Sequence, residues 1–371
     1  MDNENINPNY ENSNENHENI NKNINENFDE NVDENINENA SENPQKTDEN
    51  IFEKRIDLTV LRNAVVNIKH EISKVIVGQE KTVDLIIASV LADGHILLEG
   101  VPGVAKTLTA KLLSKIISIN FSRIQFTPDL MPSDVLGTSI FNLKTSEFEF
   151  KKGPIFSNLI LIDEINRAPA KTQAALFEVM EERQITIDGH TYPMPPPFLV
   201  IATQNPIEQE GTYRLPEAQL DRFLFKIEID YPKLEEEVQI LVKATQRGNA
   251  HQLQEVQAVI SGDEIAAYRL IIKKIHVENN LLTYIATIVG ATRNSHSLYL
   301  GASPRASLAI LNASKSFAAM QGRDFITPDD IKYVAFPVLR HRVMLTPEKE
   351  MEGINVEEVI NQIVQSVEVP R

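Results

Sequence analysis

The spacing of hydrophobic residues changes twice along the chain. Residues 58–76 place apolar side chains at every third or fourth position, which predicts an amphipathic helix, and a second helix is predicted from Val83 to Val90. Short apolar segments then alternate with helical patterns, and five of them are predicted strands: 95–100, 123–127, 159–163, 198–203 and 223–229. From about Leu234 only helical spacing continues.

Strands separated by helices predict an α/β fold with a doubly wound parallel sheet. Segments 159–163 and 198–203 are apolar throughout, as in strands covered on both faces, whereas 223–229 alternates like an edge strand with one wet face. We therefore expect an α/β domain over residues 51–232 and a smaller, all-helical domain over residues 233–371.

Residues 1–50 differ from the rest of the chain. They contain 18 asparagines and 14 acidic residues against two lysines, so they carry −12 of the net charge of −17. Isolated apolar residues there never form a face, and such a segment cannot offset the entropy lost on ordering. We expect a disordered, dispensable tail; the alternative is an acidic docking arm.

Composition excludes several classes of protein. With no cysteine there is no disulfide framework, thiolate metal site or cysteine nucleophile, which fits a reducing cytoplasm. No apolar run approaches the roughly 18 residues of a membrane helix, and the N-terminus lacks a signal-peptide pattern. The acidic balance argues against nucleic acid as a partner.

The segment GVPGVAKT (100–107) follows a predicted strand and opens a predicted helix, which is the context of a phosphate-binding loop. Gly100 and Gly103 permit a tight turn that aims backbone N–H groups at an anion. Lys106 would reach the outer phosphates and Thr107 would ligate magnesium. Ala105 replaces the usual glycine; we expect it to begin the helix, where alanine is favoured. The alternative is an ordinary strand–turn–helix.

Polar residues end two other predicted strands. Asp163 and Glu164 follow a buried strand, at the sheet edge where open α/β sheets bind ligands. Asp163 is a candidate magnesium ligand, and Glu164 is a candidate general base for an attacking water. Asn205 ends the next strand and would orient that water; alternatively it forms a turn before Pro206.

Together these motifs resemble the AAA+ ATPases, and among them the MoxR family. The resemblance runs from about residue 56 to the C-terminus. It is carried by four segments: GVPGVAKT (100–107), LILIDEINRAP (159–169), FLVIATQNPIEQEGTYRLPEAQLDRF (198–223) and GASPRAS (301–307).

The resemblance implies a role for each matching residue. Lys106 and Thr107 correspond to the Walker A pair, Asp163 and Glu164 to the Walker B pair, and Asn205 to sensor 1. The implied ATP/ADP site comprises Val77, Gly78, Gln79, Gly100, Val101, Pro102, Gly103, Val104, Ala105, Lys106, Thr107 and Leu108, with Mg²⁺ held by Thr107 and Asp163.

Two arginines complete the implied catalytic set. Arg222 resembles an arginine finger that reaches a neighbouring subunit's nucleotide, with Arg214 as a rival and an ion pair to Asp221 or Glu217 as the alternative. Arg305 resembles the sensor-2 arginine of the helical lid; otherwise it faces solvent in a first helical turn, where a cation opposes the helix dipole.

The resemblance further implies a homo-oligomeric, hexameric ring that remodels a protein client with a von Willebrand A domain partner. Segments 139–156 and 185–197 are predicted hairpins that would face the central pore or merely decorate the sheet edge.

Histidines lack metal-ligand spacing, and we expect the basic cluster around His341 to contact acidic groups. Alternatives are a magnesium-chelatase-like or nucleic-acid motor subunit and a scaffold without turnover.

Overall fold

The computed structural model describes residues 55–206, 213, 215–247 and 252–370, which belong to one compact unit. The expected tail, residues 1–50, lies outside the described residues. Within them, no helix is both long enough and apolar enough to cross a membrane.

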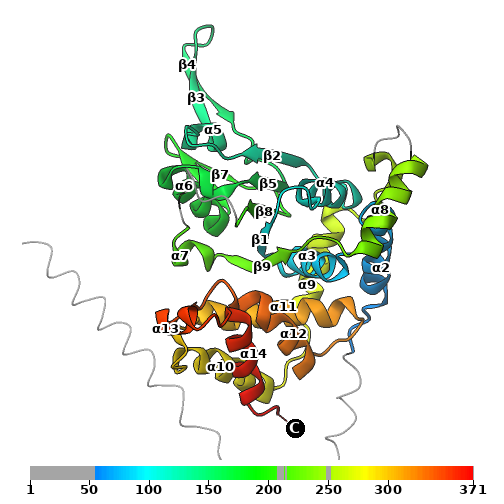
Figure 1. Cartoon of the computed structure of the whole chain (residues 1–371). Coiled ribbons are helices and arrows are strands. Elements are labelled where there is room, and N and C mark those ends of the chain that lie inside the picture. The colour runs from blue at the N-terminus through cyan, green and yellow to red at the C-terminus, as the bar shows by residue number, and fades with distance from the viewer. Residues whose placement is uncertain (1–54, 207–212, 214, 248–251, 371) are drawn as a thin grey trace, which may run out of the picture. The chain divides into compact units, whose positions relative to one another are not determined.

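A five-stranded parallel sheet in the order β2-β5-β8-β1-β9 forms the centre of the α/β part (Figure 1). Its strands are β1 (His95–Gly100), β2 (Phe121–Gln125), β5 (Leu159–Asp163), β8 (Leu199–Gln204) and β9 (Phe223–Ile229). The predicted α/β fold is thus confirmed. Strand β2 begins and ends two residues earlier than the spacing predicted, while β1, β5 and β9 have the predicted bounds.

The two faces of the sheet are covered by different helices because alternate side chains of each strand point to opposite sides. Leu98 and Ile201 belong to the core shared with α2 (Thr59–Val75), α3 (Glu80–Ala92) and α4 (Lys106–Ile116). Leu97 and Val200 belong to the core shared with α6 (Ala170–Glu182). The central strands are therefore buried on both faces, as their continuous apolar sequences predict.

Strand β9 is at the edge of the sheet, as predicted, but its outer face is not simply wet. Leu224, predicted to face water, is 8% exposed, and the lid residue Arg342 donates to its carbonyl. The helical lid therefore covers this strand.

The lid contains α10 (Asn279–Arg293), α11 (Pro304–Met320), α12 (Pro328–Leu339) and α14 (Val356–Ser366), together with the short helix α13 (Pro347–Met351) and the ribbon β10 (Leu298–Leu300) with β11 (Met344–Leu345). Helix α11 lies against α3, and α12 against β9 (Figure 1). Ser303 and Thr327 cap α11 and α12, as the Ser-Pro and Thr-Pro sequences predict.

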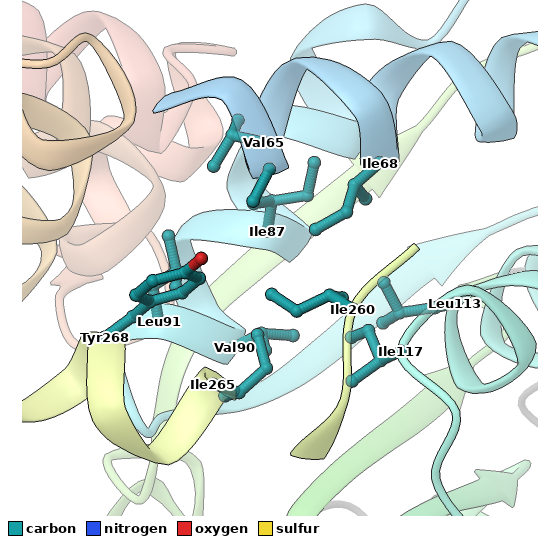
Figure 2. A pocket seen from close by; sticks show the side chains of 11 residues that line it. Val65, Ile68, Ile87, Val90, Leu91, Leu113, Ile117, Ile260, Ile265 and Tyr268 are labelled. Atoms are coloured by element: carbon teal, nitrogen blue, oxygen red, sulfur yellow. The ribbon is translucent and has the colours of Figure 1, made fainter. Parts of the chain in front are cut away.

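Two further helices connect the parts: α8 (Leu234–Arg247) and α9 (Gly262–Lys273), with a 3₁₀ turn at Gln252–Glu255. Figure 2 shows the apolar contact of Ile260 and Ile265 with side chains from α2, α3 and α4. The space left there is about 10 Å³, too small for more than one water molecule, so this junction is closely packed and offers no ligand site.

Both predicted hairpins are present. Strands β3 (Gly137–Asn142) and β4 (Glu147–Lys152) pair antiparallel after the short helix α5 (Pro132–Leu136), and β6 (Gln184–Ile187) pairs with β7 (His190–Pro193). Phe150 and Tyr192 pack with ring centroids 4.7 Å apart, and Ser139 hydrogen-bonds Asp188. The two hairpins therefore support each other.

Candidate active site

The phosphate loop lies between β1 and α4, at the carboxyl edge of the sheet. Gly100 ends β1 so close to β9 that a Cβ would approach the carbonyl oxygen of Ile229 to 2.7 Å. Gly103 has φ +90°, and a Cβ there would meet nothing within 4 Å. Another residue at this position would therefore be strained by the backbone conformation and not by contact with neighbouring atoms. Lys106 begins α4, and its Nζ donates to Gly100 O at 2.6 Å.

Ala105 does not have the helical conformation that we expected. It precedes α4 with φ 62° and ψ 19°, in the left-handed region. The prediction that alanine is favoured here was wrong, because the position needs the backbone that glycine adopts without strain. An L-residue in this region loses roughly 1–2 kcal/mol relative to the right-handed one.

A cleft of about 380 Å³ brings most of the predicted side chains together. Strand tips and the phosphate loop both line it, because parallel strands end at one edge of the sheet. The lining includes Pro102, Gly103, Ala105, Lys106, Thr107, Leu108, Asp163, Glu164 and Asn205. Gly100, Val101 and Val104 belong to the same loop but are absent from the lining, and Val104 is buried.

The acidic pair is held by three side chains that sequence reasoning did not select. The Thr203 hydroxyl donates to Asp163 Oδ1 at 3.2 Å and accepts from the Glu164 N–H at 3.0 Å. Arg123 Nε lies 2.6 Å from Asp163 Oδ2, and Gln125 Nε2 donates to Glu164 Oε2 at 2.9 Å.

These partners had a signal in the sequence. Arg123 and Gln125 alternate with buried Ile124 at the end of β2, so both point to the face opposite Ile124. The order β2-β5 then places them beside the acidic pair. Glu164 also has left-handed φ, 58°, and Arg167 Nε lies 3.0 Å from its carboxylate.

Residues 77–79, which the resemblance assigns to the ATP/ADP site, lie beside the phosphate loop and border a second cleft. Gln79 Nε2 donates to Val104 O at 3.4 Å, which joins the two segments. Val77 and Gly78 line a cleft of about 370 Å³ together with residues of α2, α3 and α8. This arrangement provides room for a base next to the phosphate-loop cleft.

Arg222 and Arg305 lie elsewhere, in a depression of about 280 Å³ that shares no lining residue with the phosphate-loop cleft. Arg222 Nη1 and Arg305 Nη2 each lie 3.0 Å from one oxygen of Glu181. Neither alternative partner predicted for Arg222 is used, and Arg305 does not simply face solvent. The rival Arg214 lies outside the described residues. We call this group, with its neighbours Arg183 and Arg342, the arginine depression.

One buried histidine, His95, lines the arginine depression, and a second, His341, contacts the backbone of Phe223 next to Arg222. His95 Nδ1 accepts from the Val200 N–H at 3.0 Å, and its Nε2 lies 3.2 Å from Met180 O, which is the pattern of a neutral ring. Burial, together with the charge of Arg183, lowers the pKa of His95 to about 3. Burial also lowers the pKa of His341, whose Nε2 lies 3.0 Å from Phe223 O.

The basic cluster of residues 340–342 contacts acidic groups, as predicted. Arg340 Nη1 lies 3.2 Å from Glu228, and Arg342 Nε lies 2.6 Å from Asp221. Among the described residues there is no group of histidine and carboxylate side chains arranged to bind a metal by themselves.

A parallel sheet with a phosphate loop and an acidic strand tip, followed by a helical lid, defines an AAA ATPase. Residues 95–225 match the family described as "ATPase family associated with various cellular activities (AAA)", and residues 290–363 match the AAA lid domain. The chain belongs to the MoxR family of these ATPases.

Individual relatives support this assignment. Chaperone MoxR1 of Mycobacterium tuberculosis is 46% identical, with 81% of each chain covered. YeaC of Bacillus subtilis is 47% identical over 81% of this chain and 92% of its own. A crystal structure from Cytophaga hutchinsonii is 43% identical with a TM-score of 0.78, and the match covers 85% of this chain and 97% of that one.

Proposed function

We propose that the protein is a magnesium-dependent ATPase that works as a ring and remodels a protein client in the cytoplasm. One observation carries this proposal: the side chains for phosphate binding and water activation share one cleft, while Arg222 and Arg305 lie in a separate depression. A complete site would therefore need two subunits, one providing the cleft and its neighbour providing the arginines.

The cleft suits ATP with magnesium. Its volume of about 380 Å³ lies within the range of small-molecule sites. The Thr107 hydroxyl and the Asp163 carboxylate are hard oxygen donors, which magnesium prefers. The ion would neutralise charge on the phosphates, and Asp163 would exchange its ion pair with Arg123 for it.

Each remaining residue has a defined task in this proposal. Lys106 binds the outer phosphates, and backbone N–H groups of residues 103–107 surround them. Glu164 accepts a proton from the attacking water, and Asn205 orients that water. Val77, Gly78 and Gln79 contact the base. Arg222 and Arg305 of the neighbour stabilise the charge that spreads over the transferred phosphoryl group.

A protein client fits the exposed hairpin better than nucleic acid does. At the end of the β3–β4 hairpin, Leu143 is 86% exposed and Phe148 is 74% exposed. Phe141 packs against Phe148 with ring centroids 5.2 Å apart. An apolar tip of this kind offers contact area to a polypeptide. Its one lysine, Lys144, stands against Glu147 and Glu149, so residues 142–149 offer no net positive charge to phosphates. The hexameric state and a von Willebrand A domain partner are parts of the same proposal, taken from the resemblance.

Subunit mixing tests the proposal. Glu164→Gln should keep ATP binding and lower kcat about a thousandfold, and Arg222→Ala should lower kcat by a similar factor. An equal mixture should regain activity, because about a quarter of head-to-tail interfaces then pair an intact cleft with an intact arginine. Wild-type specific activity should also rise with protein concentration.

Two results would contradict the proposal. Turnover that survives Glu164→Gln would mean that another group activates the water. A mixture that stays inactive, although both variants assemble with wild type, would mean that Arg222 serves its own subunit's site.

A further inference from the structure

The strongest unexplained feature of the arginine depression is the buried Arg342, which follows α12 in the lid. Its side chain is 3% exposed. Burial lowers its pKa, although Asp221 opposes this effect. A guanidinium has five N–H donors, and each one here has an acceptor. The acceptors are the Asp221 carboxylate and the carbonyl oxygens of Asp221, Phe223, Leu224 and Val338.

Four of these five acceptors belong to Asp221, Phe223 and Leu224, the residues on either side of Arg222. The distances from Arg342 are 2.6 Å to Asp221 Oδ1, 3.0 Å to Asp221 O and 2.6 Å to Phe223 O. The backbone on both sides of Arg222 is therefore tied to the lid rather than only to the sheet.

Asp221 also contacts a second part of the lid, the N-terminal cap of α11. Its second carboxylate oxygen accepts from Ser303 Oγ at 2.8 Å. Ser303 caps α11, and its Oγ accepts from the Arg305 N–H at 3.2 Å. One carboxylate thus joins the segment that carries Arg222 to the cap of α11, the lid helix in which Arg305 lies.

We propose that Asp221 is a positioning residue for Arg222: it joins the segment that carries Arg222 to the lid through Arg342 and Ser303, so that Arg222 moves together with the lid. The inference rests on the proposed function, because it assigns the arginines to a neighbour's site. A movement of the lid in one subunit would then move Arg222 relative to the nucleotide bound by the next subunit.

A double-mutant cycle tests this inference. Asp221→Ala should lower kcat roughly tenfold to a hundredfold, since a misplaced catalytic group loses about that factor. ATP affinity in the variant's own cleft should stay unchanged. The double variant Asp221→Ala with Arg222→Ala should be no slower than Arg222→Ala alone, because Asp221 acts through Arg222. Losses that multiply would overturn the inference.

Subunit mixing separates this inference from the proposed function. Asp221→Ala should regain activity with Glu164→Gln but not with Arg222→Ala. Recovery with Arg222→Ala would place the defect in the cleft and overturn the inference alone. If Arg222→Ala and Glu164→Gln fail to complement, the trans site fails, and the double-mutant cycle still decides whether Asp221 positions Arg222.

A matched control removes a comparable ion pair elsewhere in the lid. Asp330 is 3% exposed and accepts from two nitrogens of Arg323 at 2.6 and 2.8 Å, far in sequence from Arg222. Asp330→Asn should lower stability with kcat retained. Asp221→Asn, which keeps the shape and one acceptor, should recover much of the activity that Asp221→Ala loses. If Asp221→Ala does not fold, the double-mutant cycle with Arg222→Ala is measured with Asp221→Asn, and its smaller loss of kcat should likewise disappear when Arg222 is absent.

Discussion

The phosphate-loop cleft and the arginine depression differ in how their side chains are brought together. The cleft is built by strand tips and one loop that meet at a single sheet edge, so the topology of the sheet alone brings its side chains together. The arginine depression draws on the end of α3, the start of β1, α6, the start of β9, lid helix α11 and Arg342, and polar contacts between the lid and Asp221 hold it. The first can be read from motifs, whereas the second depends on how the lid is seated.

Lys106→Ala should separate the two regions most strongly. Loss of a charged phosphate contact of about 3 kcal/mol corresponds to roughly a hundredfold weaker ATP binding. Arg305→Ala should leave ATP binding by the isolated subunit unchanged, because Arg305 does not line the cleft. Titration of a fluorescent ATP analogue below the assembly concentration measures both. Equal losses in the two variants would break the division between the regions.

Acid should lower the free energy of unfolding through His95, which lines the arginine depression. The pKa of His95 is about 3 in the folded protein and about 6.5 when unfolded, so between these values the unfolded state binds more protons. The free energy of unfolding therefore falls as the pH falls, by about 2 kcal/mol from His95 between pH 8 and pH 5. Burial lowers the pKa of His341 as well, which acts in the same direction.

Chemical denaturation across this pH range measures the effect, with His95→Gln as the comparison. The variant should be less stable at pH 8 but should lose less stability on acidification than the wild-type protein. Parallel pH curves would mean that His95 is not the titrating group.

Ala105→Gly should have the smallest effect and concerns the cleft alone. Relief of the left-handed alanine favours the variant by roughly 1 kcal/mol, and the greater freedom of glycine in the unfolded chain offsets part of that. We expect thermal unfolding to shift upward slightly with little change in ATP affinity. Gly103→Ala, at φ +90°, is the opposite control and should destabilise the loop. A lower melting temperature for Ala105→Gly would contradict this account.

Sequence reasoning reached the fold and the cleft because both depend on local patterns. Continuous apolar strands, the Lys106-Thr107 pair and the Asp163-Glu164 pair each define their own position relative to a strand end. It did not find Arg123 or Gln125, because their role depends on the strand order β2-β5. It also missed Glu181, whose partner Arg222 is 41 residues away in the chain. It predicted that the cluster containing Arg342 contacts acidic groups, but it did not identify Asp221, 121 residues away, as the partner.

The conformation of Ala105 was missed for a different reason. Propensity describes helix interiors, and this residue precedes the helix by one position, where the backbone must turn. A one-residue error in an element boundary therefore reversed the expected preference.

Glu181 gives the arginine depression a built-in competitor. Its carboxylate is already engaged by Arg222 and Arg305, and because it is tethered it competes at a high effective concentration. Chloride or a single free carboxylate would have to displace this ligand for little gain in charge. In the proposed ring, a multiply charged phosphate would gain more from the same two guanidinium groups than a singly charged anion would, so Glu181 would favour the nucleotide over such anions.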